Sequence, residues 1–128
     1  MQKTIYKVKK VEVMDFKPKE AISNIKITFT RNDQVEQVVK EFNLKNPVEI
    51  VNNILLEIKK KDRMIVEDSD DVLQNIYITR IENEEEVEEK LLYFFQGLCS
   101  KFSKIRSMTR APDYMKLYDE IKTTKFVL

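Results

Sequence analysis

A long amphipathic helix is predicted by the stretch "LLYFFQGLCSKFSKI", residues 91–105. At 100° per residue, its Leu, Phe, Ile and Cys side chains fall within one arc of about 160°, which suits a helix that packs on a protein core. The opposite arc of this helix carries mostly small and polar residues: Gln96, Gly97, Ser100, Ser103, Lys104 and Ser107. A glycine inside a helix costs about 1 kcal/mol relative to alanine. Because small residues let another backbone approach closely, we interpret this face as a surface for a partner or a second helix.

Alternation of apolar and polar residues predicts several strands. The alternation is clean in "NIKITFT" (24–30), and it slips by one residue in "TIYKVKKVEVMDF" (4–16), which suits two short strands or one strand with a bulge. Two more strands are expected at 63–68 and 75–81. The terminal "KFVL" (125–128) is either a short strand or a frayed end.

After the strand expected at 24–30, the apolar residues have helical spacing. Apolar residues three and four positions apart predict a helix up to residue 42, with Asp33 as its N-cap. The positions concerned are Val35, Val38, Val39 and Phe42. A second helix is expected over 47–61, because Asn46 can cap it and Pro47 suits its first position.

Two further helices are expected in the last third of the chain. Asn83 is placed to cap a long helix over 84–106, and the Glu residues in its first turns are favoured there by the helix dipole. Pro112 is placed to start a final helix. The long helix contains the stretch at 91–105 and would supply much of the core.

The order of these elements makes the chain α+β. We expect a small antiparallel sheet of four to five strands with three to four helices packed mainly on one face, within a single domain over residues 1–128. A competing layout is a ferredoxin-like βαββαβ core with an N-terminal strand extension, in which 34–61 forms the first helical segment and "KFVL" the last strand. That layout would leave one face of the sheet exposed.

The net charge of +1 hides a segregation of charge along the chain. Residues 1–31 carry a net +5, residues 32–66 are neutral, residues 67–89 carry −9 and residues 90–128 carry +5. A near-neutral total argues against a nucleic-acid binder held by bulk charge. The basic and acidic segments either neutralise each other in the folded protein or meet a partner of opposite charge.

Missing residue types narrow the chemistry that is open to this chain. It has no His, one Cys and one Gly, so it lacks the commonest general base, a Cys–His pair and a glycine-rich phosphate loop. We therefore expect no catalytic residue, no cofactor, no metal ligand and no enzymatic activity. The lone Cys99, the lack of a signal-like segment and the lack of a long apolar run predict a cytoplasmic protein that does not enter a membrane.

Two groups of charged residues keep other functions open. A basic cluster near the end of the long helix comprises Lys101, Lys104, Arg106 and Arg110. Such a cluster predicts binding of a nucleic acid or of an acidic partner. The acidic run "EDSDD" (67–71) could hold a hard cation. Two pairs, Glu57 with Lys59 and Glu120 with Lys122, match the carboxylate and lysine of metal-dependent nucleases. A metal-dependent nuclease or phosphodiesterase is the least favoured alternative.

The favoured function is that of a small non-enzymatic interaction protein that binds a protein partner or itself. This hypothesis rests on the missing catalytic residue types, the segregated charge and the small-residue face of the long helix. Abundant Asn, Lys, Ile and Glu are typical of an AT-rich genome, so we expect a phage or mobile element as the source.

Overall fold

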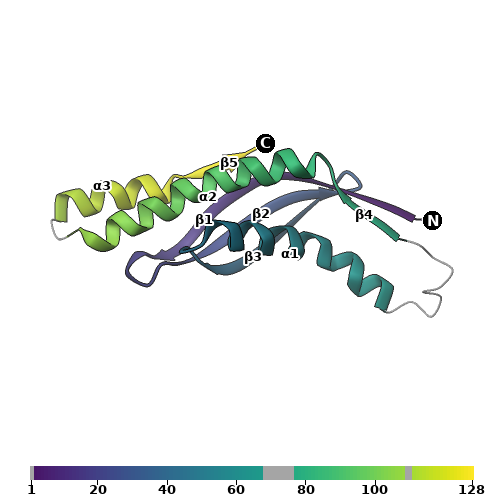
Figure 1. Cartoon of the computed structure of the whole chain (residues 1–128), viewed down its shortest axis with the longest axis horizontal. Helices are drawn as coiled ribbons and strands as arrows, with labels where there is room; N and C mark the ends of the chain where they lie inside the picture. Colours follow the sequence, from purple (N-terminus) through teal and green to yellow (C-terminus); the bar gives the residue numbers. More distant parts are fainter. Residues whose placement is uncertain (1, 68–76, 109–110) are drawn as a thin grey trace.

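The computed structural model describes residues 2–67, 77–108 and 111–128, which form an α+β fold as predicted (Figure 1). The elements in chain order are β1 (Gln2–Lys17), the 3-10 helix η1 (Pro18–Glu20), β2 (Ile22–Arg31), β3 (Gln34–Asn43), α1 (Pro47–Glu67), β4 (Tyr77–Ile81), α2 (Glu84–Ser107), α3 (Ala111–Lys122) and β5 (Lys125–Val127). The described part of the chain therefore contains five strands and three α-helices, within the predicted ranges.

The five strands form one sheet in the order β3-β2-β1-β4, and β5 also pairs with β1. β2 is antiparallel to both β1 and β3. β4 runs parallel to the start of β1, and β5 runs antiparallel to its middle, at Lys10–Glu12. The parallel pair departs from the antiparallel sheet that the sequence predicts. It arises because α1 carries the chain from the end of β3 back to the end of the sheet at which β3 and β1 begin. The next strand, β4, therefore runs in the same direction as β3 and β1.

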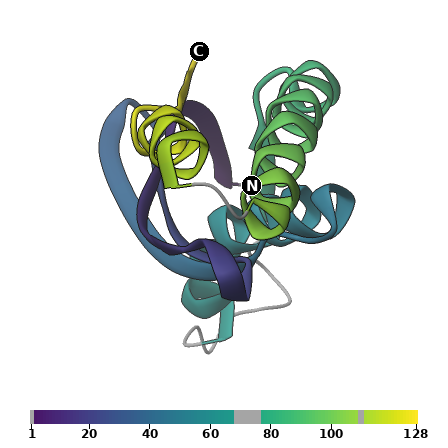
Figure 2. The ribbon, with the colours of Figure 1, turned by 90° about the vertical axis from the view of Figure 1, so that its left-hand side faces the viewer.

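The helices lie on one face of the curved sheet, as Figures 1 and 2 show. The sheet contributes paired apolar rows to this inner face: Val8 with Phe29, Val11 with Ile27, and Val13 with Ile25. Against them lie buried residues of α2 that fall on its predicted apolar arc: Leu91, Phe95, Leu98, Phe102 and Ile105. The predicted inner face of α1 is also confirmed, since Val51, Ile54, Leu55 and Ile58 are all buried.

β1 is one strand with irregular pairing, which confirms one of the two layouts predicted for 4–16. Its register with β2 shifts between Val8 and Lys10 and again between Met14 and Lys17. Each shift moves the following side chains back onto the inner face, so that one long strand can keep its apolar residues in the core.

The predicted helix up to residue 42 is wrong, because this segment forms β3. Asn32 and Asp33 both have positive φ, 48° and 68°, and make a two-residue hairpin turn between β2 and β3. Asn32 also joins this turn to β1: its Oδ1 accepts a hydrogen bond from the backbone N–H of Ile5, 3.0 Å from donor to acceptor. In β3, Val35 and Val39 point to the solvent face, 70% and 54% exposed. Their helical spacing therefore does not correspond to a buried face.

The predicted strand at 63–68 is also wrong over 63–67, which continue α1 to Glu67. A short apolar run does not distinguish strand from helix, and extending an existing helix costs far less than starting a new element. Residue 68 lies outside the described residues, and the strand predicted at 75–81 is confirmed over Tyr77–Ile81. The ferredoxin-like alternative is therefore wrong, since its first helical segment contains β3.

The predicted starts of α1 and α2 agree with the structure. The Oδ1 of Asn46 accepts a hydrogen bond from the N–H of Glu49 at 3.3 Å, as expected for the cap of α1. Asn83 precedes α2 as predicted, but its side chain makes no capping hydrogen bond. Its backbone is in the left-handed region (φ 53°), and its carbonyl oxygen accepts a hydrogen bond from the N–H of Val87 at 2.9 Å. The terminal "KFVL" forms β5, which confirms the strand rather than the frayed end.

Candidate protein-binding groove

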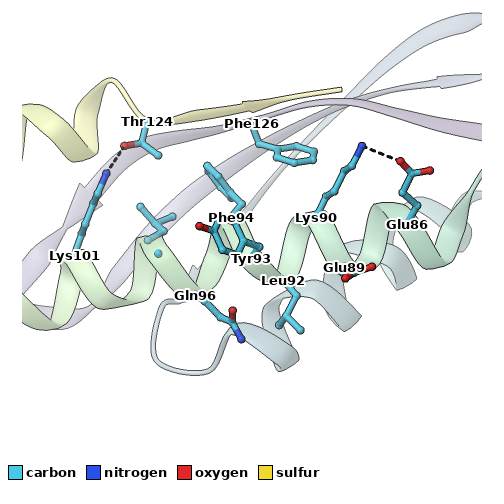
Figure 3. A pocket seen from close by; sticks show the side chains of 12 residues that line it. Glu86, Glu89, Lys90, Leu92, Tyr93, Phe94, Gln96, Lys101, Thr124 and Phe126 are labelled. Atoms are coloured by element: carbon cyan, nitrogen blue, oxygen red, sulfur yellow. Dashed lines mark hydrogen bonds and ion pairs between the residues drawn. The ribbon is translucent and has the colours of Figure 1, made fainter.

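An open groove of about 820 Å³ runs along the outer side of α2 beside β5 (Figure 3). α2 supplies most of its lining, between Glu86 and Lys101, and the chain after α3 supplies Thr124 and Phe126. Figure 3 shows Phe94 and Phe126 together on the β5 side of α2, and Leu92 and Gln96 on the opposite side. The groove therefore includes part of the small-residue face that the sequence predicts.

The floor of the groove is apolar and is held in place by the core. Phe94 and Phe126 are half-buried, and their ring centroids lie 5.7 Å apart. Phe94 also packs edge-on against the buried Phe95, with 5.0 Å between centroids. Phe126 is fixed because β5 pairs with β1, where it lies opposite Val11. The floor is thus an outward extension of the hydrophobic core.

The rim of the groove carries the exposed aromatic ring of Tyr93, and beside it the backbone of α2 is uncovered at Gly97. Tyr93 is 80% exposed, the highest value among the large hydrophobic side chains that the structure describes as exposed. Gly97, one helical turn further on, has nothing within 4 Å of the place where a Cβ would lie. Packing inside the chain therefore does not require glycine at this position, and the backbone is accessible from outside.

Charges of opposite sign occupy the two ends of α2. The first turn holds three glutamates, and the last turn holds Lys104 and Arg106. Within the groove, Glu86 and Lys90 form an ion pair at 2.9 Å, and Lys101 Nζ lies 3.5 Å from Thr124 Oγ1 (Figure 3). The groove thus has an acidic end and a basic end around an apolar middle.

The structure does not gather the predicted basic cluster on one side of α2. Lys101 is half-buried in the groove wall, whereas Lys104 and Arg106 are exposed. Lys104 and Arg106 point about 160° apart around the helix axis, because two residues turn a helix by about 200°. Arg110 lies outside the described residues.

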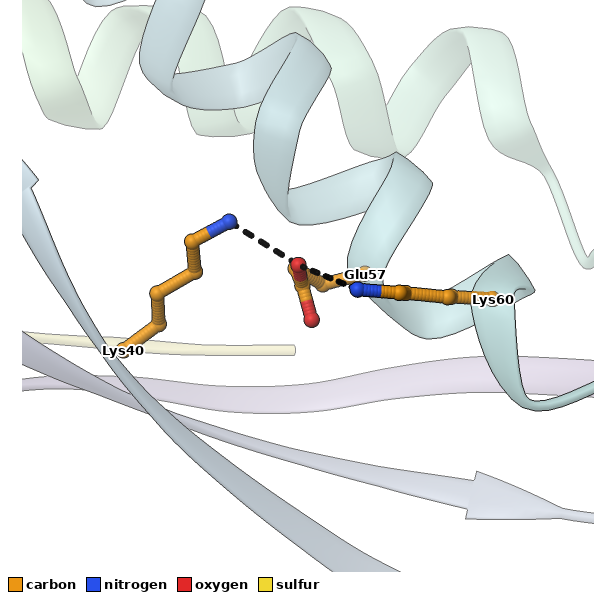
Figure 4. Close-up of polar contacts among 3 residues, drawn as sticks. All are labelled: Lys40, Glu57 and Lys60. Carbon is orange, nitrogen blue, oxygen red and sulfur yellow. Dashed lines mark hydrogen bonds and ion pairs between the residues drawn. The ribbon is translucent and has the colours of Figure 1, made fainter.

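Glu57 and Lys59, which resemble a nuclease pair in the sequence, each form an ion pair with a residue of another element. Glu57 of α1 accepts from Lys40 of β3 at 2.9 Å and lies 3.9 Å from Lys60 (Figure 4). The hydrogen bond from Lys40 holds the pKa of Glu57 below its ordinary value of 4.5. Lys59 pairs instead with Glu84 at the start of α2.

Among the residues whose side chains the structure describes, no three His, Cys, Asp or Glu side chains are grouped so that they could hold a metal ion. Most of the acidic run, 68–71, lies outside the described residues. Cys99 is half-buried beside the core, as predicted for a small hydrophobic residue, and burial raises the pKa of its thiol to about 11. A thiol with this pKa is a poor nucleophile at neutral pH.

Two residues of the groove were not identified from the sequence. Tyr93 lies on the polar arc of the helical wheel, where a large aromatic side chain stands out, so the wheel alone could have singled it out. Phe126 could not be placed, because its position depends on the pairing of β5 with β1, more than a hundred residues earlier in the chain.

None of the helices in the described parts of the chain has the length and apolar character that a bilayer crossing requires. The chain matches no protein-family model, no curated protein and no solved structure.

Proposed function

We propose that this chain is a small non-enzymatic interaction protein that binds a protein partner through the groove along α2 and β5. The observation that carries the proposal is the exposed ring of Tyr93 next to the open backbone of Gly97, above a floor of Phe94 and Phe126. Exposed aromatic side chains beside apolar pockets are typical of the few residues that supply most of the binding energy in protein interfaces.

Three features support a binding role over a catalytic one. The chain has no His, the Cys99 thiol has a raised pKa, and Glu57 is held by two lysines. The groove itself presents apolar surface and fixed charges, which suit recognition of a protein surface. We also propose a cytoplasmic location, because one half-buried cysteine suits a reducing compartment.

Site-specific photocrosslinking tests this function. A photoreactive phenylalanine replaces Tyr93 in the full chain, expressed in the cells from which the gene comes. The matched control carries the same group at Met115 of α3, which is 53% exposed and does not line the groove. We expect one adduct of defined mass from position 93, none of that mass from position 115, and loss of the adduct when Gly97→Glu is added.

Two results would overturn the proposal. The first is an absence of adducts from position 93, or the same adducts from both positions. The second is turnover of a substrate by the purified chain that a change at a single surface carboxylate abolishes. Circular dichroism of the Gly97→Glu chain shows whether it remains folded.

A second candidate function is nucleic-acid binding, and the outward face of the sheet favours it. The strand register places five basic residues on this face: Lys7, Lys10, Lys26, Arg80 and Lys125. The same registers place Glu12 and Glu41 there, so the face is basic in balance. Lysine and arginine on an open sheet can contact phosphates.

Titration of labelled single- and double-stranded DNA and RNA at about 50 and 200 mM salt tests this candidate, since phosphate-driven affinity falls steeply over that range. Charge reversal at Lys26 and Lys125 should abolish such binding if the sheet face is responsible. Reversal at Lys104 and Arg106 should do so if the basic cluster of α2 is responsible. No binding at either salt concentration rejects nucleic-acid binding by both surfaces.

A further inference from the structure

We propose that the partner in the groove is a second copy of this chain, bound so that the two α2 helices pack antiparallel about a twofold axis between Gln96 and Gly97. This inference rests on the proposed function, because the interface it describes shares Glu89, Tyr93, Gln96 and Gly97 with the groove. It is argued from the order of residues along the exposed face of α2.

The exposed face of α2 matches itself when it is reversed. An axis between Gln96 and Gly97 places Glu89 of one copy opposite Lys104 of the other, since both lie equally far from the axis in sequence. The same operation places Tyr93 opposite Ser100. All of these side chains are exposed, and they fall on one side of the helix. A twofold interface requires this self-complementarity, because one surface must serve both copies.

The sizes of the facing residues also suit this arrangement. Tyr93 projects from each helix, and the opposite helix presents Ser100 at the same level and Gly97 three residues away, next to the axis. Gly97 has no atom within 4 Å of its Cβ direction, so a ring from another chain can approach the backbone there. Helices approach most closely where small residues lie at the crossing point, and ridges then fit into grooves.

Charge selects the antiparallel orientation over the parallel one. The exposed side of α2 that carries Tyr93 holds Glu86 and Glu89 near its start and Lys104 near its end. In a parallel pair these like charges would face each other, whereas in an antiparallel pair each acidic end lies beside a basic end. The opposed helix dipoles add to the same preference. Two ion pairs between Glu89 and Lys104 are expected in each dimer.

The expected dimer is weak and depends on concentration. A helix of 24 residues is about 36 Å long, and one such helix pair buries less than the ~1,600 Å² of a standard interface. We therefore expect dissociation constants on the order of 1 to 100 µM. A monomer at high dilution is consistent with the small and polar residues that surround Tyr93 on this face.

Analytical ultracentrifugation of the full chain tests the inference by measuring dimerisation of variants in which the charge at position 89 or 104 is reversed. Glu89→Lys leaves lysine at both positions 89 and 104, and Lys104→Glu leaves glutamate at both. Each single change should weaken the dimer by about tenfold or more. Mixing the two variants in equal amounts should restore dimerisation, because each opposite pair is then one lysine and one glutamate.

The controls separate this arrangement from a general charge effect. The chain that carries both changes should again dimerise with itself. Lys116→Glu on the exposed side of α3 should leave the dimer unchanged. Circular dichroism of each variant establishes that it remains folded.

The outcomes distinguish failure of this inference from failure of the proposed function. A chain that stays monomeric at about 500 µM, or a dimer that ignores the charge exchange, overturns the inference. If the adduct from position 93 then has the mass of a different protein, the proposed function stands. If no adduct forms either, both are overturned.

Discussion

Phe16 of β1 and Phe102 of α2 pack edge to face, with ring centroids 5.7 Å apart and planes at 77°. Phe102 is fully buried, and Phe16 also lies 4.6 Å from the ring of Tyr118 in α3. These three rings join the sheet to two helices. Phe16 reaches the inner face only because β1 shifts register just before it.

The Phe16–Phe102 contact should be measurable as a coupling energy. Phe102→Ala is expected to lower the free energy of unfolding by about 3–5 kcal/mol, because it leaves a cavity in the core. In a double-mutant cycle with Phe16→Ala, the coupling should be about 0.5–1.5 kcal/mol, measured by urea unfolding. Strict additivity of the two changes would contradict the contact. Phe102→Leu provides a milder variant if the alanine chain does not fold.

Gly97→Ala should stabilise the monomer. The added Cβ meets nothing within 4 Å, and alanine is the better helix former, so we expect a gain of about 0.5–1 kcal/mol. Urea unfolding at low protein concentration measures it. Ser103→Gly, on the same exposed side of α2, should change stability in the opposite direction. A loss of stability in Gly97→Ala would show that the monomer itself needs glycine here.

Glu57 should make stability depend on pH. Its pKa is lowered in the folded state by the hydrogen bond from Lys40, so its contribution is present above the ordinary pKa of 4.5 and is lost as pH falls through the lower folded value. Glu57→Gln should therefore cost about 0.5–1 kcal/mol near pH 7 and almost nothing near pH 3.

Urea unfolding of the wild type and the variant at both pH values checks the Glu57 prediction. In a chain that already carries Lys40→Gln, the effect of Glu57→Gln should depend much less on pH. An effect of equal size at both pH values would show that the ion pair drawn in Figure 4 does not contribute to stability.

Cys99 should react slowly with thiol reagents in the folded protein. Burial raises its pKa from 9.0 to about 11, which lowers the thiolate fraction near pH 7 by about a hundredfold. Iodoacetamide labelling of the native chain should be slower than that of the urea-unfolded chain by at least this factor. Ser100→Cys in a Cys99→Ser chain places the thiol on the exposed side and should label rapidly. Equal native rates at the two positions would contradict the burial of Cys99.

Local sequence signals determined the elements whose start or face is encoded within a few residues. Asn46 and Pro47 mark the first turn of α1, and the apolar arc of 91–105 identifies the buried face of α2. The alternation in 24–30 identifies β2. In each case the neighbouring residues that form the signal also form the structure, so no distant contact was needed.

The tertiary structure decided the elements whose signals were ambiguous. Val35 and Val39 have helical spacing, but the turn at Asn32 and Asp33 places them in an edge strand, where apolar side chains remain exposed. The valines also favour a strand by their branching. Pairing with β2 therefore outweighed the helical pattern.

The groove, too, could be predicted only in part from the sequence. Its outer face, with Gly97 and its small neighbours, is readable from a helical wheel. Its floor requires Phe126 to lie beside Phe94, and this depends on the antiparallel pairing of β5 with β1. The sequence by itself determined α2 and its two faces, because a helix depends on contacts within a few residues. Only the tertiary structure decided that one face borders a groove, because strand pairing joins segments from opposite ends of the chain.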